Sequence, residues 1–166
     1  MPRADRGLLT MSFERLQWLF PIAVTLHNSE EAIFFPAWWA RLAREIPAHP
    51  NPALFRFALA LLTAAAFLVT FFNRQKGRES LWAYLTFGYI VAMLINVFIP
   101  HIPASVMFRS YTPGVVTAVL INLPVMTWLA FRALRDRWVS GRKALRFAIA
   151  VPVAMAGIIP VLLLIG

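Results

Sequence analysis

The sequence predicts an all-α fold: a polytopic integral membrane bundle of five transmembrane helices with a cytoplasmic N-terminus. Hydrophobic residues make up 60% of the 166 residues, charged residues only 14%, and the mean hydropathy is +0.69. Soluble domains are about half apolar and about a quarter charged. The apolar residues also form runs of bilayer length, and most cations lie between those runs.

Five spans are expected within a single transmembrane domain, residues 1–166. A helix needs about 20 apolar residues to cross the hydrocarbon core. Asn51 followed by Pro52 favours a helix start, because Pro fits the first helical position. No small-residue cleavage site follows the first run, so we expect it to stay in the mature protein. The expected spans are residues 16–40, 52–73, 80–100, 113–131 and 147–166.

The cations predict the orientation and exclude several function classes. Of 16 Lys and Arg residues, 12 would lie on one side, and only Arg41, Arg44, Arg56 and Arg109 on the other. The positive-inside rule then places the N-terminus in the cytoplasm, and we expect the chain in the inner (plasma) membrane. We interpret the net charge of +9 as a topology signal facing anionic lipids, with no nucleic-acid partner. The absence of cysteine excludes disulfides, thiolate metal sites and cysteine nucleophiles.

The first expected span contains an acidic motif, His27-Asn28-Ser29-Glu30-Glu31. An ionised side chain at mid-bilayer costs at least about 3 kcal/mol, so these carboxylates are expected to have a function. On a helix, His27, Glu30 and Glu31 share a face within an arc of roughly 100°. Asn28 and Ser29 point elsewhere and are expected to bind a neighbouring helix.

Two prolines in the same span each leave one backbone carbonyl without its helical partner. Pro36 does this to the carbonyl of Ala32, and Pro21 to that of Gln17. Bends of this kind often lie where a helix lines a site.

Further polar groups are expected at the same depth, in the outer half of the membrane. Asn96 and His101 end the third span, and Tyr111, Pro113 and Gly114 open the fourth. The simpler interpretation of Pro113 and Gly114 is a turn and helix start, in which Gly permits close packing. Asn96 and Asn122 are more often packing hydrogen bonds.

Together these motifs resemble the HXXEE domain family of small integral membrane proteins. The resemblance rests on His27-x-x-Glu30-Glu31, a second histidine at His101, and Tyr111-x-Pro113-Gly114, and it covers roughly residues 15–130. It supports the choice of site residues and implies a membrane protein, but it supplies no reaction.

The first hypothesis is a metal-dependent membrane enzyme acting on a lipophilic substrate. His27 and His101 would be ligands, and Glu30 and Glu31 would divide the ligand and acid–base roles. Tyr111 would orient the substrate or donate a proton, with Asn96, Pro113 and Gly114 supporting the site. Two histidines and a carboxylate suit zinc or iron. A dinuclear site would need further ligands or a second subunit.

Three alternatives remain open at this stage, as does the oligomeric state. The same residues could form a metal-free acid–base isomerase, hydratase or cyclase of lipids or isoprenoids. They could form a proton or cation relay in a transporter subunit, which would need an oligomer for a path across the membrane. They could also be interhelical polar contacts in a non-catalytic scaffold, with a carboxylate paired to Arg41, Arg44 or Arg56.

Overall fold

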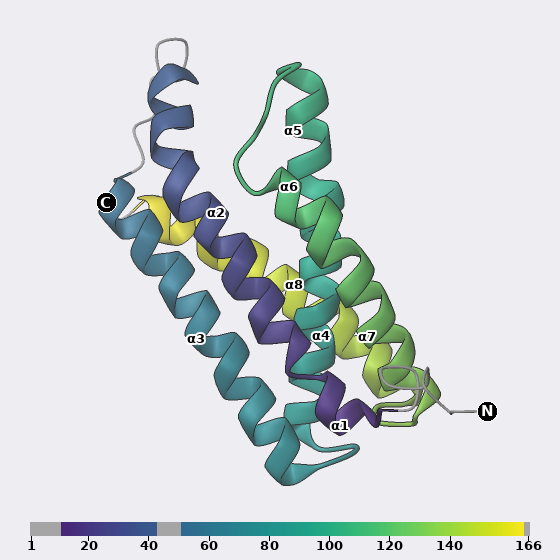
Figure 1. Cartoon of the computed structure of the whole chain (residues 1–166). Helices are drawn as coiled ribbons and strands as arrows, with labels where there is room; N and C mark the ends of the chain where they lie inside the picture. Colours follow the sequence, from purple (N-terminus) through teal and green to yellow (C-terminus); the bar gives the residue numbers. More distant parts are fainter. Residues whose placement is uncertain (1–10, 43–50, 165–166) are drawn as a thin grey trace, which may run out of the picture.

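A computed structural model describes residues 11–42 and 51–164, with side chains up to residue 157. These residues are helical and contain no strand, which confirms the all-α prediction. The five longer helices are α2 (Leu19–Leu42), α3 (Pro52–Lys76), α4 (Leu81–Asn96), α7 (Leu123–Arg135) and α8 (Gly141–Leu164) (Figure 1). The shorter helices are α1 (Phe13–Leu16), α5 (Ile102–Met107) and α6 (Val115–Thr117), and π-helical turns cover Val97–His101 and Ala118–Asn122.

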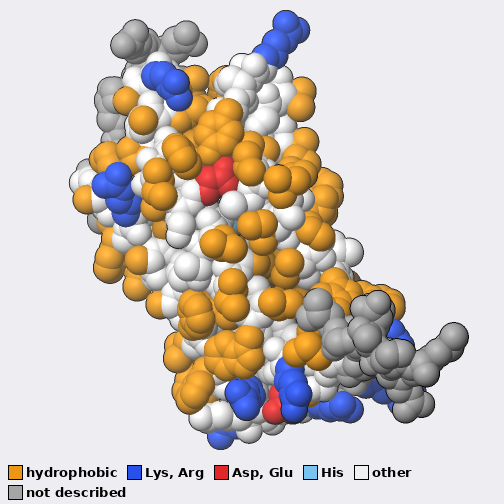
Figure 2. All heavy atoms as spheres, in the orientation of Figure 1, with side chains coloured by type: hydrophobic (Ala, Val, Ile, Leu, Met, Phe, Trp, Pro, Cys, Tyr) orange, Lys and Arg blue, Asp and Glu red, His pale blue; other side chains and the backbone are white. Residues whose placement is uncertain are grey.

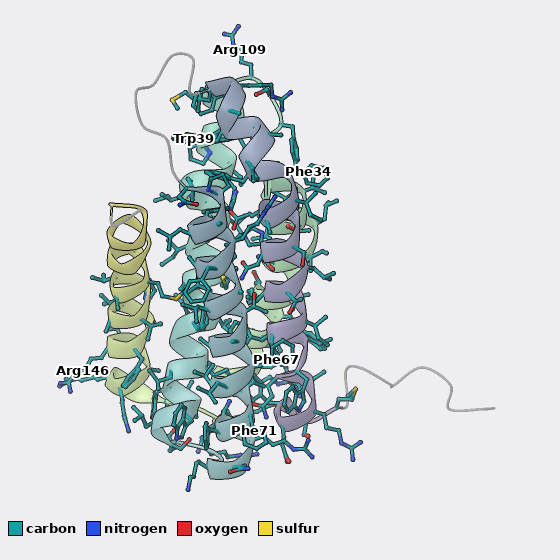
Figure 3. The ribbon with its side chains drawn as sticks, turned by 90° about the vertical axis from the view of Figure 1, so that its left-hand side faces the viewer. Phe34, Trp39, Phe67, Phe71, Arg109 and Arg146 are labelled. Atoms are coloured by element: carbon teal, nitrogen blue, oxygen red, sulfur yellow. The ribbon has the colours of Figure 1, made fainter. Side chains whose placement is uncertain are left out.

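Among the described residues, three helical segments are long and apolar enough to cross a membrane: Pro52–Lys76, Leu81–Met107 and Val115–Arg135. The outer surface agrees, since large apolar side chains stay exposed on it. Phe34 of α2 and Phe67 and Phe71 of α3, labelled in Figure 3, are 50%, 41% and 47% exposed. These features support a membrane protein. The count of five spans and the cytoplasmic N-terminus remain predictions.

The start of α3 follows the sequence prediction. The Asn51 side chain accepts hydrogen bonds from the backbone N–H groups of Ala53 and Leu54, and Pro52 occupies the first turn. The helix runs to Lys76, three residues beyond the expected end, and Gly77 follows it with φ +73°. The Ser80 side chain then caps α4 by accepting from Ala83 N–H.

The chain does not leave the third helical segment at Pro100, as the expected boundary implied, but bends and continues into α5. Ile99 has extended backbone angles (φ −147°, ψ 110°) between α4 and α5. The cause is local, because Pro100 lacks an N–H and its ring disfavours a helical conformation at the preceding residue. The bend leaves His101 buried beneath α5.

The two prolines of the first span have different outcomes. The helix is interrupted at Gln17 and Trp18, between α1 and α2, and the carbonyl of Gln17 accepts from Phe20 N–H at 3.1 Å. At Pro36 the helix continues, and the carbonyl of Ala32 instead accepts a hydrogen bond from Arg56 Nε of α3 at 3.1 Å.

Helix α4 lies at the centre of the bundle and packs against α3, α7 and α8, whereas α2 packs against α3 and the Ala118–Asn122 turn. The apolar core occupies the half containing α1, where Phe13, Leu16 and Phe20 meet Tyr84 and Trp138. On the face drawn in Figure 2, most Lys and Arg side chains lie at the lower end, beyond this core. The candidate site lies in the opposite half.

Candidate functional site

Three of the predicted ligands meet in the upper half of the bundle. His27 and Glu31 come from α2 and His101 from the turn after α4, and one ligand atom from each lies within 4.8 Å of the others. The two imidazole rings pack edge to face with centroids 4.8 Å apart. His27 is only 1% exposed and His101 only 3%, so protein surrounds both rings.

Asn96 fixes the protonation pattern of both rings. Its amide Nδ2 lies 3.1 Å from His27 Nε2 and 3.0 Å from His101 Nε2. An amide NH2 group only donates, so both Nε2 atoms accept and present lone pairs to the same point. Each neutral ring then carries its proton on Nδ1.

Glu31 lies beside these lone pairs. Its Oε1 is 3.5 Å from His101 Nε2 and 3.9 Å from His27 Nε2. With both nitrogens accepting from Asn96, neither ring offers a hydrogen to Glu31. A cation or a proton held between Glu31 and the two nitrogens would join all three atoms.

Glu30 has different partners, which lie in the loop before α6 and at the end of α6. Its Oε1 accepts from the Tyr111 hydroxyl at 2.6 Å, and its Oε2 accepts from the backbone N–H and the hydroxyl of Thr117 at 2.8 and 2.5 Å. Burial and the Glu30 carboxylate raise the pKa of the Tyr111 phenol above its ordinary value, which keeps it a donor at neutral pH. Glu30 thus stands outside the group of three ligand atoms.

Thr117 connects Glu30 to His27. A hydroxyl has one proton, which Thr117 gives to Glu30, so its oxygen accepts from His27 Nδ1 at 3.0 Å. This independent observation agrees with the tautomer that Asn96 imposes. Carboxylate-linked histidines of this kind are common around metal ions. Sequence reasoning missed Thr117, because a single threonine in an apolar run carries no signal.

Gly114 makes room for the two rings. Its φ of +87° is rarely adopted by other residues, and a Cβ there would lie 2.6 Å from His101 Cε1 and 2.9 Å from His27 Cε1. The carbonyl of Pro113 is within hydrogen-bonding reach of the His101 ring. The predicted Tyr111-x-Pro113-Gly114 element therefore lies directly over the histidine pair.

The remaining polar residues of α2 act in packing. Asn28 Nδ2 donates to the carbonyl of Leu59 at 3.1 Å and to Thr63 Oγ1 at 2.8 Å, and so joins α2 to α3 as expected. Ser29 donates instead to the Thr25 carbonyl of its own helix. In the described part of the chain neither Glu30 nor Glu31 pairs with an arginine; Arg44 lies outside that part.

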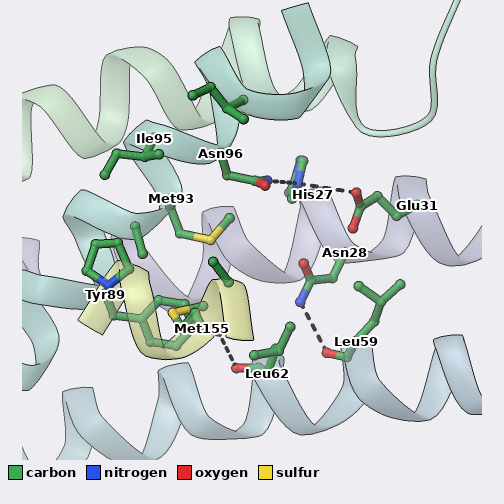
Figure 4. A pocket seen from close by; sticks show the side chains of 14 residues that line it. His27, Asn28, Glu31, Leu59, Leu62, Tyr89, Met93, Ile95, Asn96 and Met155 are labelled. Carbon is green, nitrogen blue, oxygen red and sulfur yellow. Dashed lines mark hydrogen bonds and ion pairs between the residues drawn. The ribbon is translucent and has the colours of Figure 1, made fainter. Parts of the chain in front are cut away.

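A cavity of about 150 Å³ opens beside the histidines, between α2, α3, α4 and α8. Figure 4 shows His27, Glu31 and Asn96 at its polar end and Leu59, Leu62, Met93, Ile95 and Met155 around the rest. An apolar chamber that ends on a few convergent polar groups is the common form of a small-molecule site.

Comparison with known proteins identifies a family for this chain but no function. The family model described as "Protein of unknown function with HXXEE motif" matches residues 18–129. This chain belongs to the HXXEE family. Within the HXXEE motif, the structure separates the two glutamates: Glu31 joins both histidines, whereas Glu30 binds Tyr111 and Thr117.

A relative from Bacillus subtilis (strain 168), named "Uncharacterized protein YrkK", is 28% identical to this HXXEE chain over 148 residues. The match covers 89% of this chain and 92% of that protein. No solved structure matches the chain significantly.

Proposed function

We propose that this HXXEE protein is a membrane-embedded enzyme that binds one divalent metal ion and acts on a lipophilic substrate. His27, His101 and Glu31 are the proposed ligands, and zinc or iron the proposed metal. The proposal places the chain in the plasma membrane with its N-terminus in the cytoplasm. The observation that carries it is the convergence of two imidazole nitrogens and one carboxyl oxygen within 4.8 Å of one another in a buried part of the bundle.

The donor set suits this chemistry. Two histidines and one carboxylate leave coordination positions open in zinc and non-haem iron sites. The ion would supply Lewis acidity or an activated water at an open position. Metal entry would displace the Asn96 NH2 group, and turning that amide over would bring its oxygen toward the ion.

The surrounding residues support an enzyme more than a storage site. The cavity beside His27 offers apolar walls to a substrate. Tyr111, held on Glu30, is 40% exposed and can donate a proton close to the proposed ligands.

Metal analysis of the purified protein tests the proposal. Wild type should retain stoichiometric zinc or iron after desalting, and His27→Ala, His101→Ala and Glu31→Gln should each lose it. Glu30→Gln should lose less metal than the variants that lack a ligand, because Glu30 reaches His27 only through Thr117. Ser29→Ala is the matched control and should keep the metal, because the Ser29 hydroxyl bonds to the Thr25 carbonyl of its own helix. Unchanged metal content in correctly folded His27→Ala would contradict the proposal.

A second candidate keeps the residues without the metal. Asn96 already satisfies both Nε2 atoms, so the site is also consistent with a proton shared among Glu31 and the two rings. Such a protein would be an acid–base isomerase, hydratase or cyclase of lipids or isoprenoids. Activity that survives a strong chelator, together with absent metal, would favour this candidate.

A further inference from the structure

A second cavity, of about 500 Å³, lies between the C-terminal end of α2 and the loop that follows α5. Figure 1 shows that these two segments face each other at the upper end of the bundle. We call this space the mouth cavity; it is lined by Trp38, Arg41, Leu42, Phe108, Ser110 and Tyr111.

Among the described residues, the lining combines aromatic walls with one cation, Arg41, and the hydroxyl of Ser110. The rings of Trp38 and Phe108 lie 5.7 Å apart, edge to face. Arg41 is exposed, and no carboxylate among the described residues forms an ion pair with it. A guanidinium offers a fork of donors that fits the two oxygens of a carboxylate or phosphate. Trp and other amphipathic rings favour the level of lipid head groups.

Tyr111 belongs to both the mouth cavity and the candidate site. Its ring lines the mouth cavity, and its hydroxyl donates to Glu30. On the other side, His27 and Glu31 line the apolar cavity of Figure 4. The candidate site therefore has a cationic, aromatic space on one side and an apolar one on the other, which matches the two ends of an amphiphile.

We infer that the mouth cavity binds the anionic head group, a carboxylate or phosphate, of a single-chain membrane amphiphile, with Arg41 as the residue that pairs with the anion. Ser110 supplies a hydroxyl group next to the head, and Trp38, Phe108 and the Tyr111 ring enclose the first carbons of the chain. The inference rests on the proposed function only for the reaction that would follow; binding itself needs neither metal nor turnover.

Trp38 provides the measurement, because bromine quenches tryptophan fluorescence on contact. The full-length protein in non-ionic detergent is titrated with a long-chain fatty acid brominated next to its carboxylate. The comparison ligand is the neutral alcohol with bromine on the same carbon. Wild type should bind the acid about tenfold more tightly, as expected for one charge-assisted contact. Arg41→Gln should lose this preference.

Arg56→Gln is the matched control, because Arg56 lies near the same end of the bundle but bonds to the carbonyl of Ala32. It should keep the preference. Equal binding of acid and alcohol by wild type, or equal loss in both variants, would overturn the inference. Trp38→Phe should remove the part of the quenching that comes from Trp38, while calorimetry should still show binding of the unbrominated acid.

Competition identifies the source of the anion. An alkyl phosphate that competes as well as the fatty acid supports a general anionic head group. If inorganic phosphate or acetate competed at the same concentrations, the cavity would bind free anions. That result would overturn the inference that its ligand is an amphiphile.

A metal-free arm separates this inference from the proposed function. The titration is repeated with the His27→Ala/His101→Ala double variant in chelator. A retained preference for the acid supports the mouth cavity even if the metal proposal has failed. If wild type held stoichiometric metal but showed no preference for the acid, the inference about the mouth cavity would fail and the proposed metal site would stand.

Discussion

Two buried polar clusters lie in this bundle, one in each half. In the lower half, Asn73 Nδ2 donates to Gln17 Oε1 at 2.7 Å, and Asn73 Oδ1 accepts from Trp138 Nε1 at 2.7 Å. Gln17 Nε2 in turn donates to the carbonyl of Glu14. Each donor there meets an acceptor, and none of the three side chains can carry a charge. In the upper half, two lone pairs and a carboxylate face one another.

This difference in pairing indicates that the lower cluster serves stability and the upper cluster serves function. A fully paired neutral cluster fixes the positions of helices and contributes to stability. In the upper cluster Asn96 bonds to both rings, but neither ring offers a hydrogen to Glu31, so this cluster gains energy when a cation or a proton is held between Glu31 and the rings. The lower cluster should therefore respond to mutation in folding, and the upper one in ligand binding.

The largest expected effect follows Gly114→Ala. The new Cβ would overlap both histidine rings, and the positive φ adds strain, so metal binding should be abolished and stability should fall by about 2–5 kcal/mol. Gly141→Ala is the control, because Gly141 also has a positive φ, +61°, but nothing lies within 4 Å of the added Cβ. It should cost only about 1–2 kcal/mol and leave metal content unchanged. Metal titration and thermal unfolding of both variants measure these effects. Equal metal affinity and equal stability in the two variants would contradict the prediction.

A matched pair of Asn→Leu substitutions tests the lower cluster. Asn73→Leu leaves Gln17 Oε1 and Trp138 Nε1 unpaired, at a cost of about 2–6 kcal/mol, without a change in metal content. Asn122 is equally buried, but neither of its side-chain polar atoms has a hydrogen-bond partner among the described residues. Asn122→Leu should therefore be neutral or stabilising. Denaturant unfolding measures both, and a large loss in Asn122→Leu would show that its amide has a partner.

The sequence was sufficient for the helical class and for most of the site. Charge is rare within the apolar runs, so Glu30 and Glu31 were conspicuous, and the expected topology predicted a similar depth for Asn96, His101 and Tyr111. Helix boundaries were less predictable, since Pro100 bends the chain and does not end it.

The division of labour between the two glutamates could not be read from the sequence. Both lie on one helical face, and it is the position of α6 and of the loop before it that brings Tyr111 and Thr117 to Glu30. Thr117 itself was hidden for the same reason. Its role depends on a contact 90 residues away in sequence, and its side chain is of an ordinary type.

A smaller effect is expected at Thr117. Thr117→Val removes the hydroxyl that orients His27 and should weaken metal binding about 10–100-fold, as is typical of residues that hold a ligand in place. Thr117→Ser keeps the hydroxyl and should restore the affinity, which distinguishes orientation from packing. Competition with a metal-binding dye measures both variants. Equal metal affinity in Thr117→Val and Thr117→Ser would show that the Thr117 hydroxyl does not orient His27 for metal binding.

The smallest effect belongs to Glu79, an exposed carboxylate at the lower end of the bundle. The Tyr84 hydroxyl donates to Glu79 and, together with Ser140, lowers the pKa of that carboxyl below its ordinary value. A lowered folded-state pKa gives stability that is present above the unfolded pKa of about 4.3 and is lost as the pH falls through the folded value. Glu79→Gln should thus melt slightly below wild type at pH 7, and the two should converge in acid. Acid also removes metal by protonating the ligands, but equally in both proteins. If Glu79→Gln shifted the pH at which metal is lost, the two halves of the bundle would be coupled, and the separation of stability from function would fail.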